Sequence, residues 1–128
     1  MTEHLAILKK KYLDLILSGQ KKIECRLTKI ACPPFEQVAP NDQIQLKESS
    51  GPLRAQAVVK KVRYLRNLTP ADLDQLRRDY NDLILGNDQF WTTKKNSRYC
   101  SLIWLKNVQA IPPTRIKRTG LQAWIVKK

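Results

Sequence analysis

The sequence lacks any apolar run of about 18 residues or more, the length that a membrane-spanning helix requires. Its first residues, Met1-Thr2-Glu3-His4, also lack the basic and then apolar layout of a signal peptide. The first absence argues against a membrane-spanning helix, and the second argues against secretion. We therefore expect a cytoplasmic protein that does not associate with a membrane.

Metal-binding and disulfide-forming residues are also scarce. The three cysteines, Cys25, Cys32 and Cys100, are odd in number and show no paired CxxC spacing or nearby histidine. This pattern favours neither a disulfide framework nor a zinc site. His4 is the single histidine, and its place near the terminus is more typical of an incidental residue than of a catalytic one. We predict no metal and no cofactor.

Acidic residues are few, and residues 93–128 contain none. The net charge is +13 and the pI is about 10.0, which favours a polyanionic partner, RNA or another nucleic acid. The charge is +7 over residues 1–66, −3 over residues 67–92 and +9 over residues 93–128. A well-solvated surface is the alternative explanation. The candidate phosphate-binding residues are Lys9, Lys11, Lys94, Lys95, Arg98, Lys117 and Arg118.

The 128 residues, 42% of them hydrophobic, predict one compact domain over residues 1–128. Apolar spacing and turn residues predict its elements. Thr69-Pro70 is typical of a helix start, and Asn87-Asp88 of a second one. We expect strands at about 4–8, 22–26, 43–47, 53–65, 99–111 and 123–126, a bend near Lys60-Lys61, and a stop at Pro112-Pro113.

The segment from Gly19 to Arg26 gathers charges of both signs beside a helix end. Gly19 follows a run with helical apolar spacing, so it is a plausible left-handed helix stop. In the strand that follows, Glu24 and Arg26 share one face because successive side chains alternate. A carboxylate between cations is stabilised in its charged form. Such a group is suited to bind a base edge.

The pattern Gly-x-Lys-x-x-Glu-x-Arg, after a first helix and at the start of a strand, resembles the signature of the ASCH domain family of the PUA-like superfamily. The resemblance implies an α+β fold, a PUA-like mixed β-barrel of roughly five to seven strands flanked by about three helices. It also implies a nucleobase pocket beside the first helix. The matching positions are Gly19, Lys21, Glu24 and Arg26, and the likeness continues through Asn41–Leu46, around Val58, and from Ile111 to Trp124.

Two functions remain open at this stage. The first is a non-catalytic RNA-binding module whose base pocket contains Lys21, Glu24, Arg26 and Trp91. Of the neighbouring aromatics, we expect Trp91, nearer the cations, to stack on a base, and Phe90 to lie in the core.

The second is a small metal-independent hydrolase, because some family members resemble N4-acetylcytidine amidohydrolases and others resemble ribonucleases. Lys21 and Glu24 would then be catalytic. The amidohydrolase pattern, however, has threonine where this sequence has Glu24, and no glutamate stands between Leu65 and Tyr99 to serve as its distant carboxylate.

Overall fold

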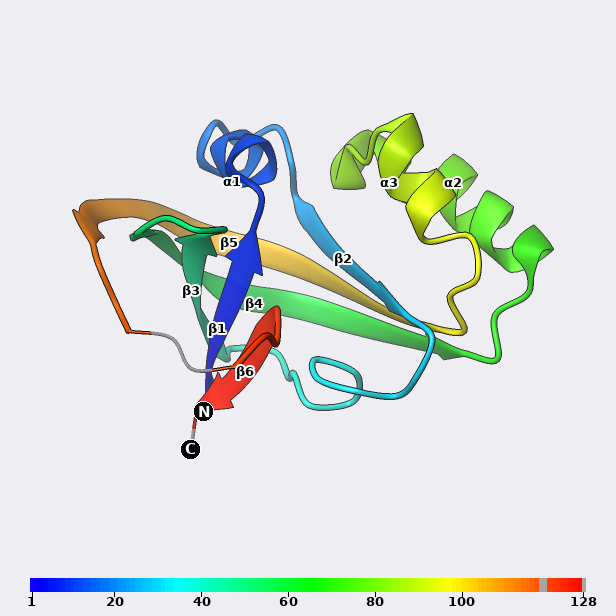
Figure 1. The fold of residues 1–128 in the computed structure, drawn as a ribbon, viewed down its shortest axis with the longest axis horizontal. Coiled ribbons are helices and arrows are strands. Elements are labelled where there is room, and N and C mark those ends of the chain that lie inside the picture. The colour runs from blue at the N-terminus through cyan, green and yellow to red at the C-terminus, as the bar shows by residue number, and fades with distance from the viewer. Residues whose placement is uncertain (118–119, 128) are drawn as a thin grey trace.

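The computed structural model describes residues 1–117 and 120–127, and within them the chain forms one six-stranded sheet and three helices (Figure 1). The elements are β1 (Glu3–Leu8), α1 (Lys10–Leu17), β2 (Ile23–Thr28), β3 (Gln43–Glu48), β4 (Leu53–Arg66), α2 (Pro70–Ile84), α3 (Asp88–Thr93), β5 (Tyr99–Thr114) and β6 (Trp124–Lys127). This architecture confirms the predicted α+β class.

The sheet is mixed and curls into a half-barrel. Its strand order is β2-β5-β4-β3-β1-β6, in which β1 and β3 are parallel and every other neighbouring pair is antiparallel. The pairing of Glu3 with Lys127 brings the two ends of the chain together. In Figure 1, α1 lies on one side of β2, and α2 and α3 lie on the other.

Helix starts follow the local sequence closely. The Thr69 side chain accepts a hydrogen bond from the Asp72 backbone N–H at 3.2 Å, and the Asp72 carboxylate accepts one from the Thr69 N–H at 2.9 Å. This is a complete capping box. The Asn87 side chain caps α3 by accepting from the Phe90 N–H at 2.8 Å. In contrast, the N-cap residue of α1, Lys9, makes no capping hydrogen bond with its side chain, and the first turn of α1 has no acidic residue.

Two groups of buried side chains hold the sheet and helices together. The first, which we call the α1 core, packs α1 against β1, β3, β4 and β6 through side chains that include Leu13, Ile16, Leu46, Val59 and Trp124. The second, which we call the α2 core, packs α2 and α3 against β2 and β5 through side chains that include Ile23, Leu27, Leu76, Trp91 and Leu102. The alternating side chains of β2 therefore contribute Ile23 and Leu27 to the α2 core and leave Glu24 and Arg26 for the inside of the curl.

Long bent strands shape the sheet. The register between β4 and β5 shifts between Val59 and Lys61, at the bend that the sequence predicts. The predicted stop at Pro112-Pro113 is wrong, since β5 runs to Thr114. The register between β4 and β5 shifts again here, because Ala110 and Thr114 pair with β4 and residues 111–113 do not. The prolines lack a backbone N–H, but at unpaired positions this interrupts no hydrogen bond between the two strands. None of the helices in the described ranges is long and apolar enough to cross a membrane.

Candidate nucleotide-binding site

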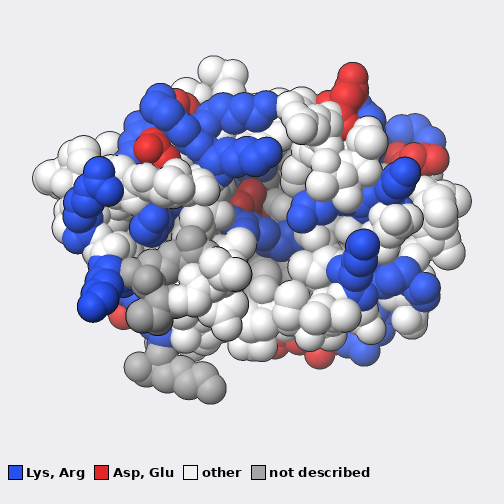
Figure 2. All heavy atoms as spheres, in the orientation of Figure 1, with Lys and Arg blue, Asp and Glu red and all other residues white. Residues whose placement is uncertain are grey.

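A cavity of about 500 Å³ opens between α1, α3 and the inside of the curled sheet. Figure 2 shows a hollow with Lys and Arg atoms around it and charged atoms of both signs within it. A cavity of this size is within the range that binds small ligands. Its walls come from β1, α1 and the residue between them (Ile7, Leu8, Lys9, Lys11, Tyr12), β2 (Glu24, Cys25, Arg26, Leu27, Thr28), the following loop (Cys32, Pro33, Pro34), the α3 region (Asn87, Gln89, Phe90, Thr93, Lys94) and the approach to β6 with its first residue (Gln122, Ala123, Trp124).

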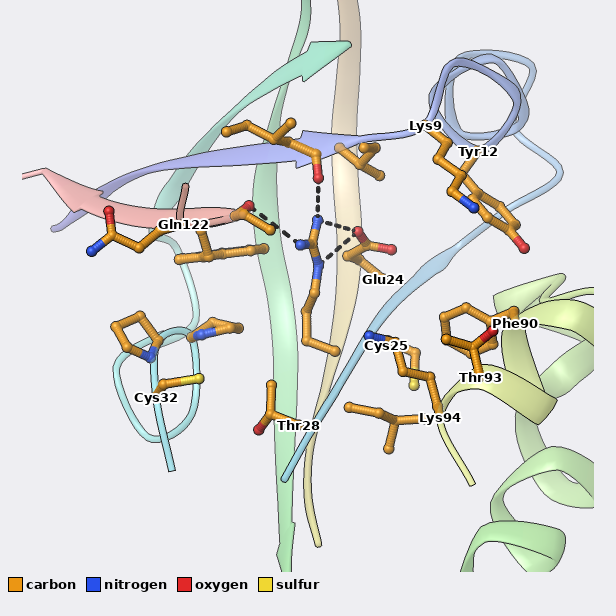
Figure 3. A pocket seen from close by; sticks show the side chains of 18 of the residues that line it. Lys9, Tyr12, Glu24, Cys25, Thr28, Cys32, Phe90, Thr93, Lys94 and Gln122 are labelled. Atoms are coloured by element: carbon orange, nitrogen blue, oxygen red, sulfur yellow. Dashed lines mark hydrogen bonds and ion pairs between the residues drawn. The ribbon is translucent and has the colours of Figure 1, made fainter. Parts of the chain in front are cut away.

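Glu24 and Arg26 form a charged pair in this cavity (Figure 3). The Nε and Nη2 atoms of Arg26 donate to Oε2 of Glu24 at 3.0 and 2.7 Å. Burial opposes ionisation of Glu24, but the charges of Arg26 and Lys21 and their hydrogen bonds outweigh it and hold the pKa of Glu24 below its ordinary value. The cavity therefore contains an ionised carboxylate.

Arg26 also joins the two sides of the curl. Its Nη2 donates to the Ile7 carbonyl at 3.1 Å, and its Nη1 donates to the Ala123 carbonyl at 3.3 Å. Its guanidinium lies 5.2 Å from the centre of the Trp124 ring, within the range of a cation–π interaction. Because Arg26 belongs to β2 and these partners belong to β1 and to the approach to β6, one side chain crosses the gap between opposite edges of the sheet.

Lys21 lies behind Glu24 and does not line the cavity. Its side chain is only 3% exposed, and Nζ donates to the carbonyls of Ile23 at 2.8 Å and Ile84 at 2.5 Å. Nζ lies 3.5 Å from Oε1 of Glu24. Burial lowers the pKa of Lys21, and the negative charge of Glu24 opposes that change. Three acceptors surround Nζ, which is the arrangement that an ammonium group requires. Lys21 therefore supports Glu24 from behind and is not among the residues that line the cavity.

Three of the seven predicted phosphate-binding residues line the cavity. Lys9 and Lys11 come from the start of α1, and Lys94 follows α3. Figure 3 shows Lys9 and Lys94 on the side of the cavity that the helices form. The other predicted cations that the structure describes, Lys95, Arg98 and Lys117, are exposed but do not line the cavity. Arg118 lies outside the described residues.

The aromatic wall differs from the prediction. Trp91 is only 7% exposed, and its Nε1 donates to the Asn81 side chain at 3.1 Å, so it belongs to the α2 core. Phe90 lines the cavity instead, with Tyr12 beside it at a ring-centre distance of 6.2 Å. The predicted roles of Phe90 and Trp91 are therefore exchanged. The reason is helical geometry, because adjacent residues on a helix point about 100° apart.

Sequence reasoning missed a buried network beneath the cavity. His4 is fully buried, and its Nε2 lies 2.8 Å from Oδ2 of Asp42. The Trp124 indole N–H donates to Nδ1 of His4 at 3.1 Å. Since the indole can only donate, Nδ1 must accept, and Nε2 carries the proton that it donates to Asp42. His4 is a structural residue and not an incidental one. Its spacing from Asp42 and Trp124 in the sequence gave no signal of this contact.

No group of three or more His, Cys, Asp or Glu side chains within residues 1–117 and 120–127 is placed to hold a metal ion. Cys25 and Cys32 line the cavity as free thiols, and the sulfur of Cys25 lies 4.0 Å from that of Cys100. The chemistry that the cavity offers is therefore that of a carboxylate, a guanidinium, lysine ammonium groups and aromatic rings.

The cavity thus lies beside the first helix of a curled, mixed six-stranded sheet, which is an α+β architecture. The crystal structure of the ASCH protein from Zymomonas mobilis matches 98% of this chain and 87% of its own, with a TM-score of 0.77 at 14% identity. A mutant form of it matches 100% of this chain and 91% of its own, with a TM-score of 0.77 at 15% identity. This chain therefore has the ASCH fold, as its sequence signature implies.

A further structure, of the hypothetical protein PH0355, matches 84% of this chain and 97% of its own, with a TM-score of 0.50 at 20% identity. No protein-family model and no curated protein matches the sequence. At these identities the likeness establishes the fold.

Proposed function

We propose that this protein is an RNA-binding module whose cavity accepts one nucleotide of a single-stranded or terminal segment. The observation that carries this proposal is the combination, in one cavity of about 500 Å³, of the Glu24–Arg26 pair, aromatic walls and lysines. A base that leaves its stack presents hydrogen-bonding edges and an aromatic face. The Glu24–Arg26 pair can bind the edge, and the aromatic walls can stack on the face.

The base is expected to lie near Glu24 and Arg26, against the rings of Tyr12 and Phe90. Stacking on aromatic side chains contributes about 1–3 kcal/mol per base. The phosphates then lie toward Lys9, Lys11 and Lys94, on the side of the cavity that α1 and α3 form. Lys9 and Lys11 at the start of α1 are unfavourable to the helix dipole, and this arrangement is expected where the charges serve a bound anion. Lys10, between them, pairs with Asp14 instead.

A hydrolase is the less supported alternative. The amidohydrolase pattern assigns catalysis to Lys21, but its Nζ donates to two backbone carbonyls and faces Glu24 from behind. A catalytic lysine needs a free lone pair directed at the substrate. Because Lys21 does not line the cavity, we favour binding without turnover.

The test is binding of a fluorescent single-stranded RNA at several salt concentrations, with wild type and with the triple variant Lys9→Ala, Lys11→Ala, Lys94→Ala. Each phosphate contact contributes about 0.7 to the slope of log affinity against log salt on single strands. Loss of three contacts should therefore weaken binding and make the slope shallower by about 2.

The matched control removes the same charge elsewhere, through Lys60→Ala, Lys106→Ala and Arg115→Ala. These three side chains are exposed and do not line the cavity. We expect the control to keep most of the slope. Equal losses in the two triple variants would mean that RNA binds the whole basic surface and not the cavity.

A further inference from the structure

The two carboxylate oxygens of Glu24 differ in their hydrogen bonding: Oε2 accepts from Arg26, and Oε1 has a single long contact. Arg26 directs two N–H groups at Oε2. In the described part of the chain, Oε1 has one polar partner, Lys21 Nζ at the long distance of 3.5 Å. An ionised carboxylate oxygen accepts about two hydrogen bonds and donates none. Beside its contact with Lys21, Oε1 therefore keeps the capacity to accept a further hydrogen bond from a ligand.

Arg26 provides a donor beside it. A guanidinium has five N–H groups. Nε uses one toward Glu24, Nη2 uses two toward Glu24 and the Ile7 carbonyl, and Nη1 uses one toward the Ala123 carbonyl. One N–H of Nη1 is therefore left without a partner among the described residues. The cavity thus presents a charged acceptor next to a charged donor.

We propose that this pair selects nucleotides whose base has an exocyclic amino group, which are those of cytosine, adenine and guanine, over uracil. The inference rests on the proposed function, because it assumes that the cavity holds a base. An amino group donates to Oε1, and an adjacent ring nitrogen, which is N3 of cytosine, N1 of adenine or N3 of guanine, accepts from Arg26.

Uracil cannot make the same pair of contacts without a penalty. Its one base N–H lies between two carbonyl oxygens. A carboxylate that approaches this N–H meets an acceptor on each side, and like partial charges repel. Rejection of uracil thus comes from an unfavourable contact as well as from a missing one, which is a common source of specificity.

The size of the cavity adds no discrimination among the favoured bases. A volume of about 500 Å³ is large enough for a purine or a pyrimidine. The selectivity should therefore follow the amino group and not the number of rings. Cytidine and uridine monophosphates provide the sharpest comparison, since they have the same ring size, sugar and phosphate and differ in this part of the base edge.

The experiment measures binding of the four ribonucleoside 5′-monophosphates to the wild-type protein by isothermal titration calorimetry at low salt. We expect uridine monophosphate to bind at least about tenfold more weakly than cytidine monophosphate, because a hydrogen bond to a charged group is lost. Glu24→Gln should bring the ratio toward one, since the amide N–H can donate to the uracil carbonyl. Lys94→Ala should weaken both ligands equally and leave the ratio unchanged.

The outcomes separate this inference from the function on which it rests. Equal affinity of wild type for cytidine and uridine monophosphates, or preference for uridine, overturns the selectivity and leaves nucleotide binding intact. Absence of binding to all four nucleotides, together with absence of RNA binding, overturns the proposed function. The wild-type comparison decides the matter even if Glu24→Gln fails to fold.

Discussion

Arg26 contributes to the cavity and to the fold with one side chain. Its Nε and Nη2 atoms donate to Glu24, and Nη2 and Nη1 each also donate to a backbone carbonyl, that of Ile7 and that of Ala123. Lysine cannot replace it, because an ammonium group has three donors on one atom and lacks the planar fork. One side chain that lines the cavity thus also holds the edges of the sheet together.

The buried network continues this support below the cavity. Trp124 packs under Arg26, its indole N–H is held by His4, and His4 is held by Asp42. Asp42 also accepts from the backbone N–H groups of Thr2 at 3.1 Å and Ala39 at 3.0 Å. Burial acts to raise the pKa of Asp42, but the hydrogen bonds from His4, Thr2 and Ala39 outweigh it and hold the pKa below its ordinary value.

This shift predicts acid sensitivity. Since the pKa of Asp42 is lower in the folded protein than its ordinary 3.8, ionised Asp42 stabilises the folded state above about pH 3.8, and this contribution is lost as the pH falls through the folded value. Asp42→Asn should lower the free energy of unfolding by about 1–3 kcal/mol at neutral pH. The difference from wild type should shrink on acidification, as measured by urea unfolding between about pH 6 and about pH 3.

Asp74→Asn is the control, because Asp74 is an exposed residue of α2. We expect it to have little effect at any pH. If the stabilities of wild type and Asp42→Asn fall in parallel with pH, the charge of Asp42 does not contribute to folding stability.

At this scale the sequence predicted Glu24 and Arg26 correctly as neighbours, because alternation along a strand is a local rule. It misplaced Lys21 and Trp91. The orientation of Lys21 depends on the Ile84 carbonyl, 63 positions away, and Trp91 depends on Asn81 across a turn. Contacts of this kind follow from tertiary packing, which neither spacing nor composition encodes.

Among the elements, α3 is short, and the turn before it sets its position. The Asn81 side chain binds both the N–H and the carbonyl of Gly86, at 2.9 and 3.0 Å, and accepts from the Trp91 indole. A Cβ atom at Gly86 would lie 2.7 Å from Cδ2 of Phe90 and 2.9 Å from Nε1 of Trp91. Gly86 is thus required by the close approach of two aromatic side chains, one of which lines the cavity.

Gly86→Ala should therefore destabilise the fold and displace the aromatic wall. Overpacking of this kind typically costs about 1–3 kcal/mol. We expect a lower midpoint of urea unfolding. We also expect the variant to bind nucleotides more weakly under conditions where it is folded, because Phe90 moves. Thermal or urea unfolding and calorimetric titration measure the two effects on the same sample.

Gly51→Ala is the matched control, since the added Cβ there would meet the Glu48 side chain, and neither residue lines the cavity. It should change stability without changing nucleotide affinity. Unchanged affinity in folded Gly86→Ala would show that the position of Phe90 is unimportant for the ligand.

The elements themselves were largely predictable. The caps of α2 and α3, the hairpin between β3 and β4 and the bend near Lys61 are local features with local sequence signals. The sequence did not predict that β5 extends beyond Pro112. Whether a proline ends a strand depends on which backbone N–H groups the neighbouring strand binds. The curl that brings β2 close to β1 and β6 is also a property of the whole sheet.

For the whole molecule, the net charge of +13 has two opposite consequences. It attracts polyanions, and it destabilises the compact state through repulsion among like charges. Lysines at the start of α1 and after α3 line the cavity. Further exposed cations, such as Lys60, Lys61 and Arg63, lie along β4. Salt screens both effects, because the Debye length falls as ionic strength rises.

Salt should therefore move binding and stability in opposite directions. Raising the NaCl concentration from about 50 to about 200 mM should weaken RNA binding strongly, because each counterion that is released gains less entropy when the salt concentration of the solution is higher. Over the same range we expect the melting temperature to rise by about 2–5 °C, equivalent to roughly 1 kcal/mol for a domain of this size.

Fluorescence anisotropy measures the RNA affinity, and scanning calorimetry in matched buffers measures the melting temperature. We expect the triple lysine variant to show a smaller change in both. A melting temperature that falls with salt would mean that surface ion pairs such as Arg54–Asp14 outweigh the repulsion among like charges.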